Sequence, residues 1–166
     1  MSILVLGVGN ILLSDEGLGV RVIEKIKEGY VLPEDVKLLD GGTLGIELLY
    51  FLEGSEKLII VDAIKGGGPP GTLYKFSGDE VKAYFKGKIS AHELGIQEVL
   101  GIAQLTDRYP KEVVVIGMEP ESLEVSLELS QTVKDNLEKL IKSVIEQLKE
   151  WNIEVKHVDE RARHTV

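Results

Sequence analysis

The chain has 166 residues, with 19 Lys and Arg against 28 Asp and Glu, so its formal net charge is −9. Its length fits one domain, and its acidity argues against a nucleic-acid partner, which clustered Lys and Arg would bind. Because cysteine is absent, disulfides, thiol nucleophiles and Cys-ligated metals are excluded. No apolar stretch reaches the roughly 18 residues of a membrane span. We expect a soluble, cytoplasmic, monomeric protein with no membrane partner.

Short apolar runs at 3–8, 36–39, 58–64 and 113–116 predict buried strands. Amphipathic patterns after the first glycine-rich turn, after Gly45, after His92 and from Ser130 to Trp151 predict helices, with Ser130 as an N-cap. The weak alternation at 72–76 favours an edge or antiparallel strand. This order predicts an α/β fold with a mostly parallel sheet of about five strands and helices on both faces. We expect one domain over residues 1–158 and a disordered tail over 159–166.

Polar residues follow the ends of three predicted strands. Asn10, Asp15 and Glu16 come after the first strand, Asp40 ends the second and Asp62 ends the third. The carboxyl ends of parallel strands meet at one edge of a sheet, where ligands bind. Carboxylates that converge there repel one another unless a cation or proton relieves them. The pattern therefore indicates a metal site.

Each acid also has an ordinary structural explanation. Asp40 lies in Asp-Gly-Gly-Thr, which suits a turn or a helix cap equally well. Asp62 closes a Leu-Ile-Ile-Val run, so it is expected to be buried and to need a partner, which favours a functional role. Asp15 and Glu16 are adjacent and cannot both point into one crevice from a regular helix start. One of them should face the site, and the other should act as a cap or face solvent.

His92 is one of three histidines and precedes a predicted helix. A helix N-terminus disfavours the imidazolium, and the neutral imidazole is the form that binds a metal. A lone histidine is more often structural, so its role as a ligand depends on whether Glu16 and Asp62 lie nearby. Two carboxylates and one imidazole would suit nickel, manganese or zinc.

Several familiar site types do not match the sequence. The second histidine of a HExxH zinc site is missing. The turn GVGNILLSDEGLG fails as a dinucleotide fingerprint because Leu12 stands where the third glycine is needed. No GxSxG elbow accompanies a serine. Leu12, Leu13 and Leu44 beside the motifs are expected to pack inside rather than to form a docking patch.

The chain resembles the [NiFe]-hydrogenase maturation endopeptidases over residues 3–148. The resemblance is carried by GVGNILLSDEGLG, DGGT at 40–43, the IIVDA strand, SAHELG around His92 and GMEPES at 117–122. It implies a three-layer α/β/α sandwich around a twisted, mixed sheet.

The resemblance also implies an activity: nickel-dependent removal of the C-terminal extension of the hydrogenase large-subunit precursor after nickel insertion. Glu16, Asp62 and His92 are then the catalytic and metal-binding residues, and the nickel is held in the precursor and shared with the site. Other divalent metals can substitute. The implied substrate-binding residues are Asn10, Asp40, Gly41, Gly42 and Thr43. As a hypothesis, the nickel or one carboxylate polarises the attacking water.

Two other functions fit parts of the pattern. A non-catalytic nickel carrier would use the same three ligands and leave the precursor's mass unchanged. A small-molecule hydrolase or phosphorylase on a similar scaffold would need basic residues in the crevice, where this sequence has acids and glycines.

Overall fold

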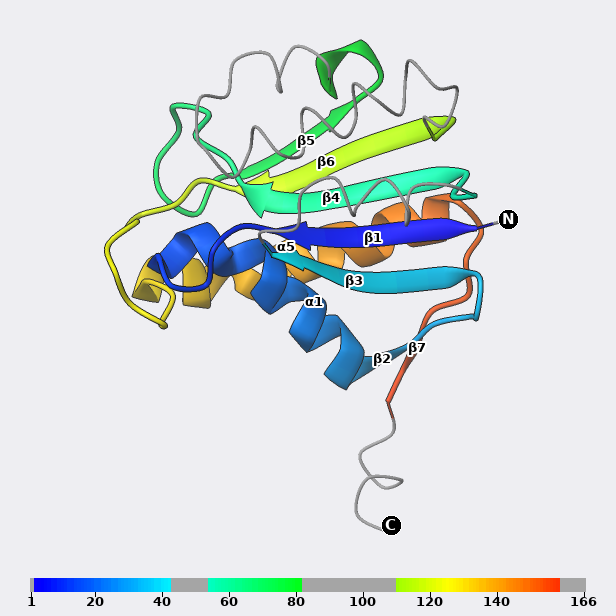
Figure 1. Ribbon diagram of the computed structural model, residues 1–166, viewed down its shortest axis with the longest axis horizontal. Coiled ribbons are helices and arrows are strands. Elements are labelled where there is room, and N and C mark those ends of the chain that lie inside the picture. Colours follow the sequence, from blue (N-terminus) through cyan, green and yellow to red (C-terminus); the bar gives the residue numbers. More distant parts are fainter. Residues whose placement is uncertain (1, 43–53, 82–109, 159–166) are drawn as a thin grey trace, which may run out of the picture.

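The computed structural model describes residues 2–42, 54–81 and 110–158, and its core is a five-stranded sheet in the order β3-β1-β4-β6-β5 (Figure 1). The four parallel strands are β1 (Ile3–Val8), β3 (Val36–Gly42), β4 (Lys57–Ala63) and β6 (Glu112–Met118). β5 (Leu73–Ser77) pairs with β6 in the antiparallel direction at the sheet edge. The predicted fold class, a mixed and mostly parallel sheet of five strands, is confirmed.

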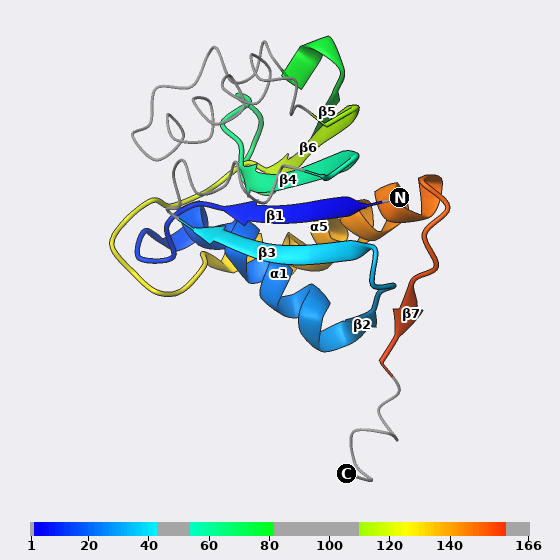
Figure 2. The same cartoon turned by 45° about the vertical axis from the view of Figure 1, so that its right-hand side comes forward.

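Two helices, α1 (Leu18–Gly29) and α5 (Gln131–Glu150), pack against one face of this sheet, as both views show (Figures 1 and 2). The short 3-10 helix η1 (Ser14–Gly17) directly precedes α1 and contacts β4. α5 begins where predicted, because the Ser130 side chain accepts a hydrogen bond from Val133 N at 3.3 Å. The helices predicted after Gly45 and after His92 lie outside the described residues.

Strand alternation divides the core into two apolar clusters, one on each face of the sheet. Val5, Val61 and Ile116 belong to the cluster under α1 and α5, whereas Leu6 and Ile60 belong to the other. Both clusters are almost completely buried. The central strands are therefore apolar on both faces, which is why they read as continuous runs in the sequence.

The glycines of the first turn allow α1 to approach the sheet closely. A Cβ on Gly7 would lie 2.4 Å from Gly19 O, and a Cβ on Gly19 would lie 2.1 Å from Val61 O. Gly9 has φ +119°, and a Cβ there would lie 1.9 Å from Glu16 O. These glycines bring the backbone of η1 and α1 against the ends of β1 and β4, which explains a glycine pattern that does not match a dinucleotide fingerprint.

A second, two-stranded sheet joins the C-terminal end of α1 to the last described residues. β2 (Tyr30–Val31) pairs with β7 (Lys156–His157) in the antiparallel direction, and the rings of Tyr30 and His157 lie 4.7 Å apart. Strands of two residues carry too little pattern to be predicted. The predicted tail, 159–166, lies outside the described residues. Of the helices in the described ranges, none is long and apolar enough to cross a membrane.

Candidate functional site

The four parallel strands end at one edge of the sheet, and the predicted acids lie there. Asp62 is the penultimate residue of β4, and Glu16 lies in η1, which follows the loop after β1 and contacts β4. Asp62 is 1% exposed and Glu16 is 8% exposed. Burial of two carboxylates in one region is costly unless other groups compensate their charge. This edge is therefore the candidate functional site.

Asp62 points away from α1. It alternates with Val61 and Ala63, which belong to the cluster under the helices, so its side chain shares the opposite face with Leu58 and Ile60. Its Oδ1 accepts a hydrogen bond from Ala63 N at 2.9 Å. The expected burial of this acid is confirmed.

Glu16 is placed by the close approach of η1 to the sheet. Its carbonyl abuts Gly9, and three residues later Gly19 packs on the carbonyl of Val61, the residue directly before Asp62. The two acids therefore lie on adjoining segments that glycines hold together. A side chain at Gly9 or Gly19 would push these segments apart.

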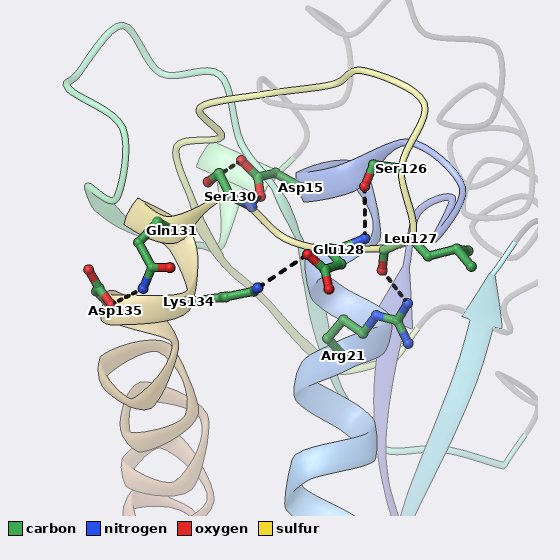
Figure 3. A network of polar contacts seen from close by, with 9 residues as sticks. All are labelled: Asp15, Arg21, Ser126, Leu127, Glu128, Ser130, Gln131, Lys134 and Asp135. Carbon is green, nitrogen blue, oxygen red and sulfur yellow. Dashed lines mark hydrogen bonds and ion pairs between the residues drawn. The ribbon is translucent and has the colours of Figure 1, made fainter.

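Asp15 is the structural member of the adjacent acid pair (Figure 3). It is 0% exposed and accepts four hydrogen bonds. The donors are Glu121 N at 2.8 Å, Ser122 N at 3.0 Å, and both N and Oγ of Ser130 at 2.8 Å. Asp15 thereby fastens the loop between β6 and α5 onto η1, which carries Glu16.

The predicted substrate-binding residues occupy different parts of this edge. Asn10 is half-buried, and its Oδ1 accepts a hydrogen bond from Leu12 N at 2.9 Å, which shapes the loop after β1. Asp40 is exposed on β3, and its register partner Gly7 faces α1. Strand alternation thus places Asp40 on the face opposite to Asp62, so the two acids share an edge but not a face.

Gly41 and Gly42 end β3 at a register shift. Gly7 pairs with Asp40, whereas the next residue, Val8, pairs with Gly42, so Gly41 is the extra residue. A Cβ on Gly41 would lie 2.7 Å from Leu6 Cδ1. Thr43 lies outside the described residues, and substrate binding by this segment stays a prediction.

His92, the third predicted metal ligand, also lies outside the described residues. Within the described ranges, no group of three His, Cys, Asp or Glu side chains could hold a metal ion. Glu16 and Asp62 fit a site for a hard or borderline cation as oxygen donors, and they need a further ligand to complete it. The three-ligand site stays a prediction.

Glu119 is a buried acid at the same edge that the sequence analysis did not single out. It directly follows β6 and is 8% exposed, and its Oε1 accepts hydrogen bonds from Gly66 N and Tyr74 Oη, each at 2.8 Å. Burial, and then the hydrogen bond to Glu119, raise the pKa of Tyr74 above its ordinary value of 10.0. Like Asp62, Glu119 is an acid at the end of an apolar run, and that signal could have revealed it.

Leu12 is 56% exposed, so the prediction that it packs inside is wrong. The loop after β1 carries it outward, because the neighbouring backbone is bonded to the loop after β6. Leu13 is partly buried, and Leu44 lies outside the described residues. Val125 and Leu127 on the β6–α5 loop are also exposed, at 85% and 61%.

Comparison with known proteins agrees with this fold. The family model of hydrogenase maturation proteases, HycI, matches residues 20–147. The hydrogenase 2 maturation protease of Escherichia coli K12 is 44% identical over 155 residues, covering 93% of this chain and 94% of the relative. The hydrogenase expression/formation protein HupD of Rhodobacter capsulatus is 43% identical over 155 residues, covering 92% of this chain and 74% of the relative.

Solved structures give the same result. The hydrogenase maturating endopeptidase HybD from Escherichia coli superposes with a TM-score of 0.91 at 44% identity, covering 95% of this chain and 98% of that one. The [NiFe] hydrogenase maturation protease HybD from Thermococcus kodakarensis has a TM-score of 0.74 at 29% identity, and the match covers 89% of this chain and 99% of that one. The chain therefore belongs to the hydrogenase maturation protease family, a family of peptidases.

Proposed function

We propose that this protein is an endopeptidase that removes the C-terminal extension of a [NiFe]-hydrogenase large-subunit precursor after nickel insertion. The observation that carries the proposal is the pair of buried carboxylates, Glu16 and Asp62, on adjoining segments at the carboxyl edge of the sheet. Family membership supports the peptidase class and the hydrogenase substrate.

The nickel belongs to the substrate in this proposal, and the enzyme recognises it. Two carboxylates in a buried region favour a nearby positive charge, which relieves their repulsion. Glu16 and Asp62 supply oxygen ligands, and His92 supplies a nitrogen ligand. Because the precursor brings the ion, a loaded precursor binds better than an empty one by the free energy of these contacts. Selection of the loaded form follows from this difference in affinity.

Peptide hydrolysis also needs a base for the attacking water and an acid for the leaving amine. Among the described groups at the site, the carboxylates of Glu16 and Asp62 are the ones that we propose accept a proton from water. One carboxylate takes this proton as the water oxygen attacks the scissile carbonyl carbon. The same group then gives the proton to the amine as the C–N bond breaks, so the protonation state of the enzyme is restored. Asp40, Asn10 and the 41–43 segment are proposed to bind the extended peptide.

The intact mass of a nickel-loaded precursor, before and after incubation with the protein, tests this function. We expect loss of a C-terminal fragment from the loaded precursor and no change in a metal-free control. His92→Ala and Asp62→Asn should abolish processing, whereas the exposed Asp135→Asn on α5 should process at the normal rate. The His92 variant should remain folded by circular dichroism.

Two results would contradict the proposal. If nickel moves between the two proteins while the precursor keeps its full mass, the chain is a carrier. If His92→Ala processes at the wild-type rate, the histidine has no part in the site.

A further inference from the structure

An exposed apolar surface lies beside the candidate site. It consists of Leu12, in the loop after β1, and Val125 and Leu127, in the loop between β6 and α5; we call these three residues the apolar patch. Their exposed fractions are 56%, 85% and 61%. The two loops are bonded to each other, since Ser126 N donates to Leu12 O at 3.0 Å. Clustered exposed apolar residues commonly mark a protein interaction site.

The fold does not need these apolar side chains. Polar groups hold the β6–α5 loop at both ends through Asp15 and in its middle through Ser14, whose N donates to Ser126 O at 2.9 Å. Arg21 Nη2 also donates to Leu127 O at 2.9 Å (Figure 3). The loop is therefore fixed by its backbone, while the side chains of Val125 and Leu127 remain in water. Their exposure is unfavourable for the free protein, and contact with a partner would relieve it.

Acidic side chains flank Val125 and Leu127 along the β6–α5 loop. Glu121, Glu124 and Glu128 are exposed on the same loop, and of these Glu128 has an ion pair, with Lys134 at 3.7 Å. A complementary partner therefore presents apolar side chains together with Lys or Arg. A second copy of this chain fits poorly, because a two-fold interface would bring these glutamates against their own copies.

We propose that the apolar patch, together with Glu121, Glu124 and Glu128, binds a segment of the substrate precursor that carries apolar and basic side chains. This proposal rests on the proposed function. The connection between the segments supports this occupant. Asp15 fastens the β6–α5 loop to η1 directly beside Glu16, so the loop that carries Val125 and Leu127 adjoins the segment that carries Glu16. A chain bound on the patch is thereby directed toward the buried carboxylates.

Kinetics with nickel-loaded precursor test the apolar part. In the double variant Val125→Ser/Leu127→Ser we expect KM to rise about tenfold or more with kcat nearly unchanged, because contacts remote from the reacting atoms contribute uniform binding. The matched control is Val31→Ser/Leu73→Ser, which alters apolar residues of 55% and 40% exposure on β2 and β5. It should leave KM unchanged. Thermal unfolding should show both variants folded.

Charge reversal tests the acidic part. Glu121→Lys/Glu124→Lys should raise KM several-fold at low salt, and this difference should shrink at high salt as charges are screened. Glu146→Lys, on the exposed face of α5, is the control and should have no such effect.

The outcomes separate this proposal from the proposed function. Normal cleavage with an unchanged KM in the Val125/Leu127 variant overturns the docking surface alone. If the wild-type protein binds the precursor without cleaving it, the proposed function fails. In that case a dissociation constant for the precursor that is higher in the double variant than in the wild type supports the docking surface, and an unchanged one overturns it. Light scattering tests the other occupant: if the wild-type protein is a dimer and the Val125/Leu127 double variant is a monomer, the patch binds a second copy and the proposed docking surface is wrong. A lack of binding between the wild-type protein and the precursor also overturns the proposal.

Discussion

Replacement of Asp15 should destabilise the protein more than replacement of any exposed acid. Asp15 has no solvent exposure and accepts three backbone N–H donors and one hydroxyl. In Asp15→Ala the three N–H groups lose their partner, and the Ser130 hydroxyl can rotate to another. At about 1 kcal/mol for each part-buried donor left unpaired, the free energy of unfolding should fall by about 3 kcal/mol. Domains are typically stable by only about 5–15 kcal/mol, so this loss is large.

Asp15→Asn provides an intermediate case. Its remaining carbonyl oxygen can keep the bonds from Glu121 N and Ser122 N, but its NH₂ then faces the Ser130 N–H donor. We expect a loss of about 1–2 kcal/mol, between wild type and alanine.

Urea unfolding measures both variants, and Asp135→Ala is the control. Asp135 is exposed on α5 and accepts a hydrogen bond from Gln131 at 2.7 Å, so its loss should change stability by no more than about 0.5 kcal/mol. Hydrogen exchange should quicken at the Glu121, Ser122 and Ser130 amides in Asp15→Ala. If Asp15→Ala unfolds at the same urea concentration as the wild type, Asp15 does not stabilise the fold by holding the β6–α5 loop.

Two further predictions concern packing and pH. Gly19→Ala should lower the free energy of unfolding by about 3 kcal/mol or more, measured by urea unfolding, because its Cβ would meet backbone oxygen at 2.1 Å. Gly29→Ala, with no atom within 4 Å of its Cβ, should be neutral or slightly stabilising, and equal effects would contradict this packing. The pKa of Tyr74 is higher in the folded protein than in the unfolded chain, so the folded state favours the neutral phenol. This stabilisation is fully present below pH 10 and is lost as pH rises through the folded-state pKa. When the free energy of unfolding is measured against pH, it should therefore fall less above pH 10 in Tyr74→Phe than in the wild type. An identical fall in both proteins would refute this role of Tyr74.

The sequence by itself determined the sheet and the two helices, α1 and α5, that cover one of its faces. The runs at 3–8, 58–64 and 113–116 are apolar on both faces, and a continuous run of that length has few other ways to be buried. The long 3–4 repeat before Trp151 and the Ser130 cap likewise fixed α5. Asp62 could be placed at the carboxyl edge because it ends such a run.

Only the tertiary structure decided what adjacent polar and apolar residues do. Asp15 and Glu16 look alike in the sequence, and contacts with residues more than a hundred positions away made Asp15 the anchor of a loop. Leu12 was expected inside, but pairing with Ser126 carries it to the surface. Asp40 and Asp62 both end strands, yet register and alternation send them to opposite faces. Periodicity reports the local environment of each strand or helix, whereas these assignments depend on which distant segments meet, and that is set by packing of the whole chain.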